Sequence, residues 1–148
     1  MARNYVQGIY VPQNSDRYVG QKNPIYRSSW EMNFCLFLDT HPSVLSWGSE
    51  CVKIPYINPL TGKSTIYIPD FLMVYQHKSG AKIADLVEIK PMAQAQMREG
   101  KMQPHEQATV LKNHAKWKSA MKWCKNFGLN FRVLTELDLM HLGGQRRR

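Results

Sequence analysis

The sequence of 148 residues predicts a single-domain α/β fold in which a central strand is covered on both faces. Residues 66–75 and 81–90 alternate with the period that is typical of β-strands. The first of these runs is apolar on both sides, as expected for a strand that lies between two layers. Residues 104–127 carry apolar side chains at helical spacing, which predicts a long helix packed against the sheet.

Two elements are expected before these strands. Residues 26–38 have the pattern of an amphipathic helix, and Ser28 and Glu31 have the spacing of a capping box. On local sequence alone, capping this helix is the favoured role of Glu31. A first strand is expected at residues 51–57, and the turn signals in residues 58–63 lead from it into the next strand.

The strands at 66–75 and 81–90 are separated by a short turn that contains a glycine, which favours an antiparallel hairpin. If His77 lies opposite Ala81, then Asp70 lies directly opposite Glu88. Directly opposed side chains share one face, with their Cβ atoms roughly 5 Å apart. A shift of one residue would separate the two acids, so the prediction depends on the turn.

Two carboxylates this close repel each other, and a divalent cation between them removes the repulsion. Carboxylate oxygens suit Mg²⁺, which can polarise a phosphoryl oxygen and lower the pKa of a bound water. Lys90 lies on the same face as Glu88 and could orient that water or neutralise charge that develops on phosphate. The carbonyl of Ile89 could supply a further ligand, and Glu31 could deliver a third acid from its helix. The alternative is a surface hairpin whose acids are only solvated.

The helix at 104–127 begins with Pro104 and is followed by Gly128, which suit a first turn and a C-terminal cap. Its expected core stripe contains Val110, His114, Trp117, Met121 and Cys124. We therefore expect His114 to be a core residue and not a catalytic base. Beyond it, residues 129–134 predict a strand and residues 135–142 a short helix.

The net charge of +9 and the isoelectric point near 9.6 predict a polyanionic partner such as DNA. No acid occurs between Gln107 and Thr135, although this range is rich in lysine. The candidates for phosphate binding are Lys112, Lys116, Lys122, Arg146, Arg147 and Arg148. Such binding would depend strongly on salt. The alternative is charge that serves only solubility.

Several other functions are disfavoured. The sequence contains no two-histidine zinc helix, no glycine-rich phosphate loop and no serine in a nucleophile elbow. No apolar run is long enough for a membrane span, and the N-terminus lacks the apolar core of a secretory signal. The three cysteines are expected to be buried free thiols.

The order of the acidic motifs resembles the PD-(D/E)xK superfamily of nucleases. Glu31 lies on a first helix, Asp70 follows a proline at a strand, and Glu88 and Lys90 form the Glu-x-Lys motif on the paired strand. Within the superfamily, the Tyr-Arg-Ser-x-Trp-Glu opening and the Lys-Trp-x-x-Ala-x-x-Trp-Cys helix resemble the head-completion nucleases of large contractile-tailed phages. Transposon end-cleaving endonucleases are a more distant match.

This resemblance implies a restriction-endonuclease-like fold, a mixed β-sheet flanked by helices. It implies Glu31, Asp70, Glu88 and Lys90 as catalytic residues, with the three acids as metal ligands and Mg²⁺, or Mn²⁺ in its place, as cofactor. The implied activity is hydrolysis of packaged phage DNA when a filled head is prepared for its tail. DNA and phage head or neck proteins would be the partners, in the host cytoplasm, with virion association left open.

The resemblance covers roughly residues 26–134. The nuclease domain is expected at residues 26–142, preceded by an N-terminal arm at 1–25 and followed by a basic tail at 143–148. Residues 92–103 are polar and could be a loop that closes over substrate or a simple connector. The sequence leaves endonuclease and exonuclease action open. It also leaves open a non-catalytic DNA-binding or connector protein of the virion, and a junction-resolving or transposition-type endonuclease.

Overall fold

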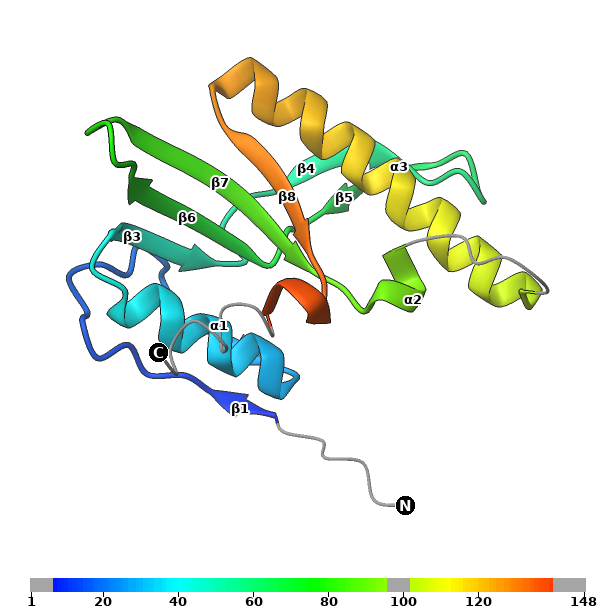
Figure 1. Cartoon of the computed structure of the whole chain (residues 1–148). Coiled ribbons are helices and arrows are strands. Elements are labelled where there is room, and N and C mark those ends of the chain that lie inside the picture. Colours follow the sequence, from blue (N-terminus) through cyan, green and yellow to red (C-terminus); the bar gives the residue numbers. More distant parts are fainter. Residues whose placement is uncertain (1–6, 96–101, 140–148) are drawn as a thin grey trace.

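A computed structural model describes residues 7–95 and 102–139 and confirms the mixed α/β architecture. The central sheet has the strand order β3–β6–β7–β8, and two small sheets pair β1 with β2 and β4 with β5 (Figure 1). β8 is parallel to β7, whereas the other pairs are antiparallel. The central strands are β3 (Val44–Ser49), β6 (Phe71–Gln76), β7 (Lys82–Ile89) and β8 (Asn130–Leu134).

A helix covers each face of the central sheet (Figure 1). On one face, α1 (Ser29–Thr40) packs through a cluster that includes Phe34, Leu38, Trp47 and Val87. On the other face, α3 (Pro104–Phe127) packs with the small sheet of β4 (Ile54–Ile57) and β5 (Ser64–Tyr67). Leu86 and Val87 are adjacent in β7 but belong to different clusters, Leu86 on the α3 side and Val87 on the α1 side. The alternating side chains of this strand therefore contribute to two cores, one on each face of the sheet.

The expected helix at 104–127 is confirmed, and Gly128 ends it with a positive φ of 72°. The buried stripe differs from the prediction and consists of Val110, Asn113, Trp117, Ala120 and Cys124. His114 is exposed and Met121 is 54% exposed, so placing them in the core was wrong. Asn113 can be buried because its side-chain amide donates to the carbonyl of Gln94, at 3.1 Å, in α2 (Met92–Ala95).

The continuous strand expected at 66–75 is divided between two sheets. β5 ends at Tyr67 and pairs with β4, whereas β6 begins at Phe71 in the central sheet. Pro69 lies in the break, where it has no N–H to donate to a ladder. Ile66 is consequently 53% exposed, which corrects the prediction that both faces of this run are covered.

The strand predicted at 51–57 exists as β4 and belongs to the small sheet. The first strand of the central sheet is instead β3, which pairs with β6 and which the sequence pattern did not reveal. The strand predicted at 129–134 is confirmed as β8, and residues 136–139 are helical after the cap residue Thr135. Among the residues that the structure describes, no helix is long and apolar enough to cross a membrane.

The described part of the N-terminal segment packs on α1 and β3. β1 (Gly8–Ile9) pairs with β2 (Ile25–Tyr26) on either side of this segment. Buried Asp39 of α1 accepts hydrogen bonds from the Tyr10 hydroxyl at 2.7 Å and from the Gln13 and Asn14 amides at 2.6 and 3.0 Å. The segment is therefore fixed to the domain by hydrogen bonds to one buried acid.

Two further predictions concern cysteines and the segments at the margins of the described residues. All three cysteines are free, but Cys51 is exposed, so the expectation of buried thiols holds only for Cys35 and Cys124. The basic tail at 143–148 and most of the predicted loop at 92–103 lie outside the described residues.

Candidate active site

The β6–β7 hairpin has the register on which the site prediction depends. The His77 amide donates to the Ala81 carbonyl at 2.8 Å, and Phe71 pairs with Val87 at the other end of the ladder. Continuing this register by one residue sets Asp70 opposite Glu88. The condition stated from the sequence, that the turn places these two acids opposite each other, is therefore met.

Backbone groups fix Asp70 at the point where the chain enters the central sheet. Its carboxylate oxygen Oδ2 accepts a hydrogen bond from the Ile89 amide at 2.8 Å. Its carbonyl accepts a hydrogen bond from the Glu50 amide at 2.9 Å. Because Pro69 interrupts the ladder, the side chain of Asp70 lies at the start of β6 and not within a strand.

Glu88 lies near the end of β7 and is only 5% exposed. Its Oε1 accepts a hydrogen bond from the Tyr67 hydroxyl at 2.9 Å. Its Oε2 forms an ion pair with the Lys90 ammonium at 3.5 Å. Both oxygens of this buried carboxylate therefore have a partner, and the predicted proximity of Glu88 and Lys90 is present.

The charged forms of both acids are disfavoured in the folded protein. Burial raises the pKa of Asp70 to about 8, with a further contribution from the charge of Glu88 and an opposing one from the Ile89 amide. Burial likewise raises the pKa of Glu88, against the lowering effects of Lys90, the Tyr67 hydroxyl and Lys116. A half-buried and a buried carboxylate whose charged forms are both disfavoured are a donor set that fits a hard divalent cation.

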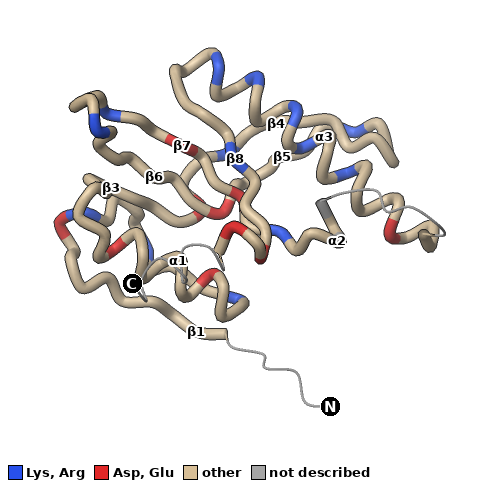
Figure 2. Tube along the Cα trace, in the orientation of Figure 1, with Lys and Arg blue, Asp and Glu red and all other residues tan. Residues whose placement is uncertain are grey.

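Lysines of α3 approach the same site. The Lys116 ammonium lies 5.5 Å from the centroid of the Tyr67 ring. Burial lowers the pKa of Lys116, and the neighbouring charges of Lys90 and Lys112 lower it further. Figure 2 shows lysines at intervals along α3. Of the predicted phosphate-binding residues, Lys116 is close enough to Glu88 for its charge to lower the pKa of that acid. Lys112 is close enough to Lys116 to lower the pKa of its ammonium.

The other predicted phosphate-binding residues lie elsewhere. Lys122 is exposed and lines a groove between α3 and the small sheet, with Trp123 beside it. Arg146, Arg147 and Arg148 lie outside the described residues.

Glu31 adopts the capping-box arrangement at the start of α1. Its amide donates to the Ser28 hydroxyl oxygen at 3.1 Å, and its carboxylate accepts from the Ser28 hydroxyl and the Arg27 amide, both at 3.3 Å. Its charge also contributes to the raised pKa of Asp70. Within residues 7–95 and 102–139, no three His, Cys, Asp or Glu side chains form a group that could hold a metal ion.

Tyr67 was not identified from the sequence. It precedes Asp70 by three positions, and a polar hydroxyl on a buried aromatic residue next to the acidic motif was the available signal. Its role depends on a contact with Glu88 on another strand, which alternation within one strand does not predict.

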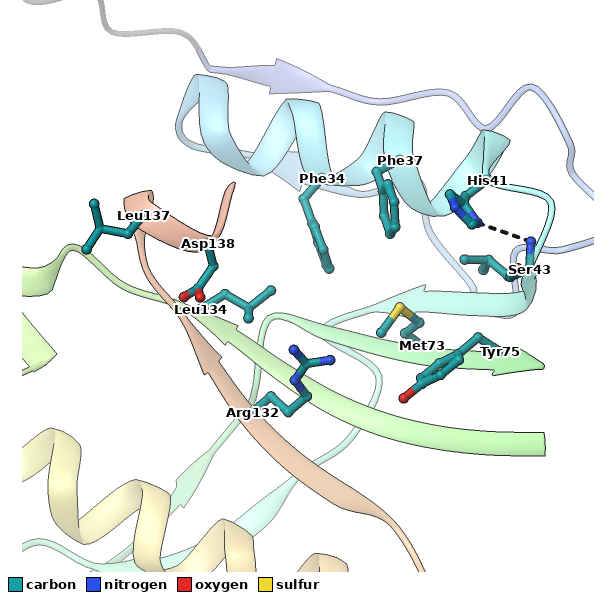
Figure 3. Close-up of a pocket in the computed structure, with 11 residues that line it drawn as sticks. Phe34, Phe37, His41, Ser43, Met73, Tyr75, Arg132, Leu134, Leu137 and Asp138 are labelled. Carbon is teal, nitrogen blue, oxygen red and sulfur yellow. Dashed lines mark hydrogen bonds between the residues drawn. The ribbon is translucent and has the colours of Figure 1, made fainter. Parts of the chain in front are cut away.

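A cavity of about 610 Å³ lies on the other face of the central sheet, between α1 and β8 (Figure 3). Its lining includes the apolar side chains of Phe34, Met73 and Leu134, with Arg132 and Asp138 among its polar groups. Phe34, Met73 and Leu134 belong to the α1 cluster, whereas Tyr67, the partner of Glu88, belongs to the α3 cluster. This cavity is therefore separate from the carboxylate pair.

A mixed sheet flanked by helices, with paired acids and a lysine on one hairpin, is consistent with the restriction-endonuclease-like class of nucleases. The family described as TnsA-like endonuclease N terminal matches residues 41–136. The chain is also 35% identical over 149 residues to the head completion nuclease of Enterobacteria phage T4, covering 92% of this chain and 95% of that protein.

The chain therefore belongs to the TnsA-like endonuclease family. The resemblance to head-completion nucleases that the motifs predicted is confirmed by the similarity to the phage T4 protein. This membership supports a nuclease that hydrolyses DNA. The matched range includes Asp70, Glu88, Lys90 and Lys116, and it begins after Glu31.

Proposed function

We propose that the protein is a Mg²⁺-dependent deoxyribonuclease whose metal is held by Asp70 and Glu88. The observation that carries the proposal is the pair itself, two facing acids whose charged forms are disfavoured by burial, with the charge of Glu88 also raising the pKa of Asp70. Few structural roles require that arrangement, whereas a divalent cation relieves it. Glu31 assists in holding the cation, directly or through a water. The charge of Glu31 contributes to the raised pKa of Asp70, which supports the proximity of the two acids.

The residues of the site have separate tasks. When bound, the cation supplies Lewis-acid polarisation of a phosphoryl oxygen. Lys90, on the solvent side of Glu88, supports the attacking water and neutralises charge that develops on the phosphate. Lys112, Lys116, Lys122 and the arginines of the tail bind the DNA backbone. Backbone contacts carry no sequence information, so little sequence specificity is expected.

We further propose that the substrate is packaged phage DNA, cut or trimmed during head completion and the joining of head and tail. The support is the similarity over nearly the whole chain to a protein named head completion nuclease. On this proposal, phage head or neck proteins are the partners that restrict a nuclease of low sequence specificity to its place of action. It would work in the host cytoplasm during assembly and could remain with the virion.

The test is incubation of the purified protein with supercoiled plasmid, linear duplex and branched DNA, each with Mg²⁺, Mn²⁺ or EDTA. We expect cleavage with Mg²⁺ and none with EDTA, and the preferred substrate separates endonuclease, exonuclease and junction-resolving action. Asp70→Ala should abolish cleavage and leave DNA binding intact or stronger. The matched control is Asp85→Asn, which alters a buried acid of β7 that contacts Asn130 and Arg132 instead of the site.

Unchanged cleavage by Asp70→Ala would overturn the site assignment. A different result would support a non-catalytic DNA-binding protein of the virion. In that case the protein would shift DNA in a gel, less so at high salt, but would neither cleave it nor bind metal in calorimetry.

A further inference from the structure

Tyr67 is the residue on which three elements of the site converge. Its side chain is 3% exposed at the end of β5, and its hydroxyl donates to Glu88 of β7 at 2.9 Å. The ammonium of Lys116, from α3, lies 5.5 Å from the ring centroid. One side chain of the small sheet thus contacts both a carboxylate of the central sheet and a cation of the covering helix.

The ring of Tyr67 is held in a fixed orientation. Tyr56 meets it at a centroid distance of 6.5 Å and an interplanar angle of 81°, and Phe131 meets it at 6.3 Å and 76°. Both contacts have the edge-to-face geometry that aromatic pairs favour. Because β4 and β8 supply these two rings, the position of the Tyr67 hydroxyl is determined by packing and not by the site alone.

The hydroxyl decides how Glu88 is oriented. Lys90 pairs with Oε2 and is the more exposed partner of that ion pair, whereas the Tyr67 hydroxyl reaches Oε1 in the buried interior. Without this donor, Oε1 would be a buried acceptor with no hydrogen-bond partner. The carboxylate would then lower its free energy by turning toward solvent or Lys90. A carboxylate free to turn binds a cation less well than one held in place.

We propose that Tyr67 is a positioning residue of the active site, whose hydroxyl orients Glu88 for the metal and whose ring holds the Lys116 ammonium beside the scissile phosphate. This inference rests on the proposed metal site at Asp70 and Glu88. Lys116 acts as a fixed positive charge and transfers no proton. A cation held against an aromatic face loses less conformational freedom when phosphate arrives, which is how the ring would contribute.

The decisive variant is Tyr67→Phe, which keeps the ring and its packing and removes only the hydroxyl. We expect a roughly tenfold weaker affinity for Mg²⁺ by calorimetry and a fall of 10- to 100-fold in kcat, as found when an outer-shell partner of a metal ligand is removed. Binding of DNA in EDTA should stay close to that of the wild type, whereas the midpoint of thermal unfolding should fall by a few degrees because the buried Oε1 loses its donor.

The matched control is Tyr56→Phe, because Tyr56 is a buried tyrosine whose ring contacts Tyr67 but whose hydroxyl makes none of the described hydrogen bonds. It should retain the Mg²⁺ affinity of the wild type. Equal Mg²⁺ affinity and kcat in the two variants would overturn the role of the Tyr67 hydroxyl. Failure of the wild type itself to bind Mg²⁺ or cleave DNA would instead contradict the proposed function.

The role of Lys116 has its own comparison. Lys116→Met removes the charge but keeps an unbranched side chain, and it should lower kcat more than tenfold without weakening Mg²⁺ binding. Lys118→Met, two positions along α3 and exposed, is the control and should change kcat less than threefold. Equal kcat values for these two variants would show that Lys116 has no part in the chemical step.

Discussion

Replacing Asp70 by Asn should stabilise the metal-free protein increasingly as the pH rises. The pKa of Asp70 is raised from 3.8 to about 8 in the folded state. Between these values the folded protein retains a proton that the unfolded chain has released. The free energy of unfolding therefore decreases as the pH rises through this window, and the loss is complete above pH 8. Asparagine carries no charge, so the variant escapes this loss.

The size of the effect follows from the shift. A difference of about 4 pKa units, at 1.36 kcal/mol each, gives an upper bound of about 6 kcal/mol at pH 8. The half-buried carboxylate is relieved in part when water enters and Lys90 moves, so we expect a gain of about 2 kcal/mol for Asp70→Asn at pH 8 and almost none at pH 4. The amide oxygen of asparagine can still accept the hydrogen bond from Ile89.

The assay is urea unfolding in EDTA at pH 4, 6 and 8, followed by the fluorescence of the four tryptophans. The stability difference between Asp70→Asn and the wild type should widen at each step. Asp85→Asn is the control, because Asp85 is buried with Asn130 and Arg132 as partners and should lose stability on substitution. Parallel curves for Asp70→Asn and the wild type across this range would refute the reasoning.

Three further predictions follow from the same contacts. The affinity of the wild type for Mg²⁺ should rise from pH 6.5 to pH 8.5, because the cation must displace the proton of Asp70; calorimetry should show this rise, and a flat profile would contradict it. Glu31→Gln keeps a side chain that can complete the capping box, so its thermal stability should be unchanged. Loss of cleavage in this stable variant would identify Glu31 as a metal ligand. Unchanged cleavage would show that Glu31 only caps the helix. Asp39→Ala removes the acceptor of three hydrogen bonds from the N-terminal segment and should destabilise the fold by about 3 kcal/mol in urea unfolding, with little change in kcat.

The hairpin and the long helix were predictable because their signals are local. The turn at residues 77–80 determines the register, and the register alone sets Asp70 opposite Glu88. Pro104 and Gly128 similarly mark the ends of α3 in the sequence itself. Capping of α1 by Glu31 is also a local interaction, and the structure shows it as expected.

What the sequence did not predict depends on contacts between distant segments. Alternation at 66–75 shows extended chain on both sides of Pro69, but it does not indicate that the two parts pair with different partners. β3 mixes serine and glycine with its apolar residues, so its pattern is weak although it pairs along β6. The Tyr67 hydroxyl reaches Glu88 only when the small sheet packs beside β7, and Lys116 reaches Tyr67 only when α3 packs on that sheet.

The break at Pro69 means that the groups of the site belong to two ladders that share no strand pairing. Hydrogen bonds within either sheet do not set the distance between them. α3 contacts both β4 and β8, so the packing of this helix holds the small sheet and the central sheet together. On the proposed function, DNA that binds the lysines of this helix would act on the site through the packed side chain of Tyr67, which contacts both Lys116 and Glu88.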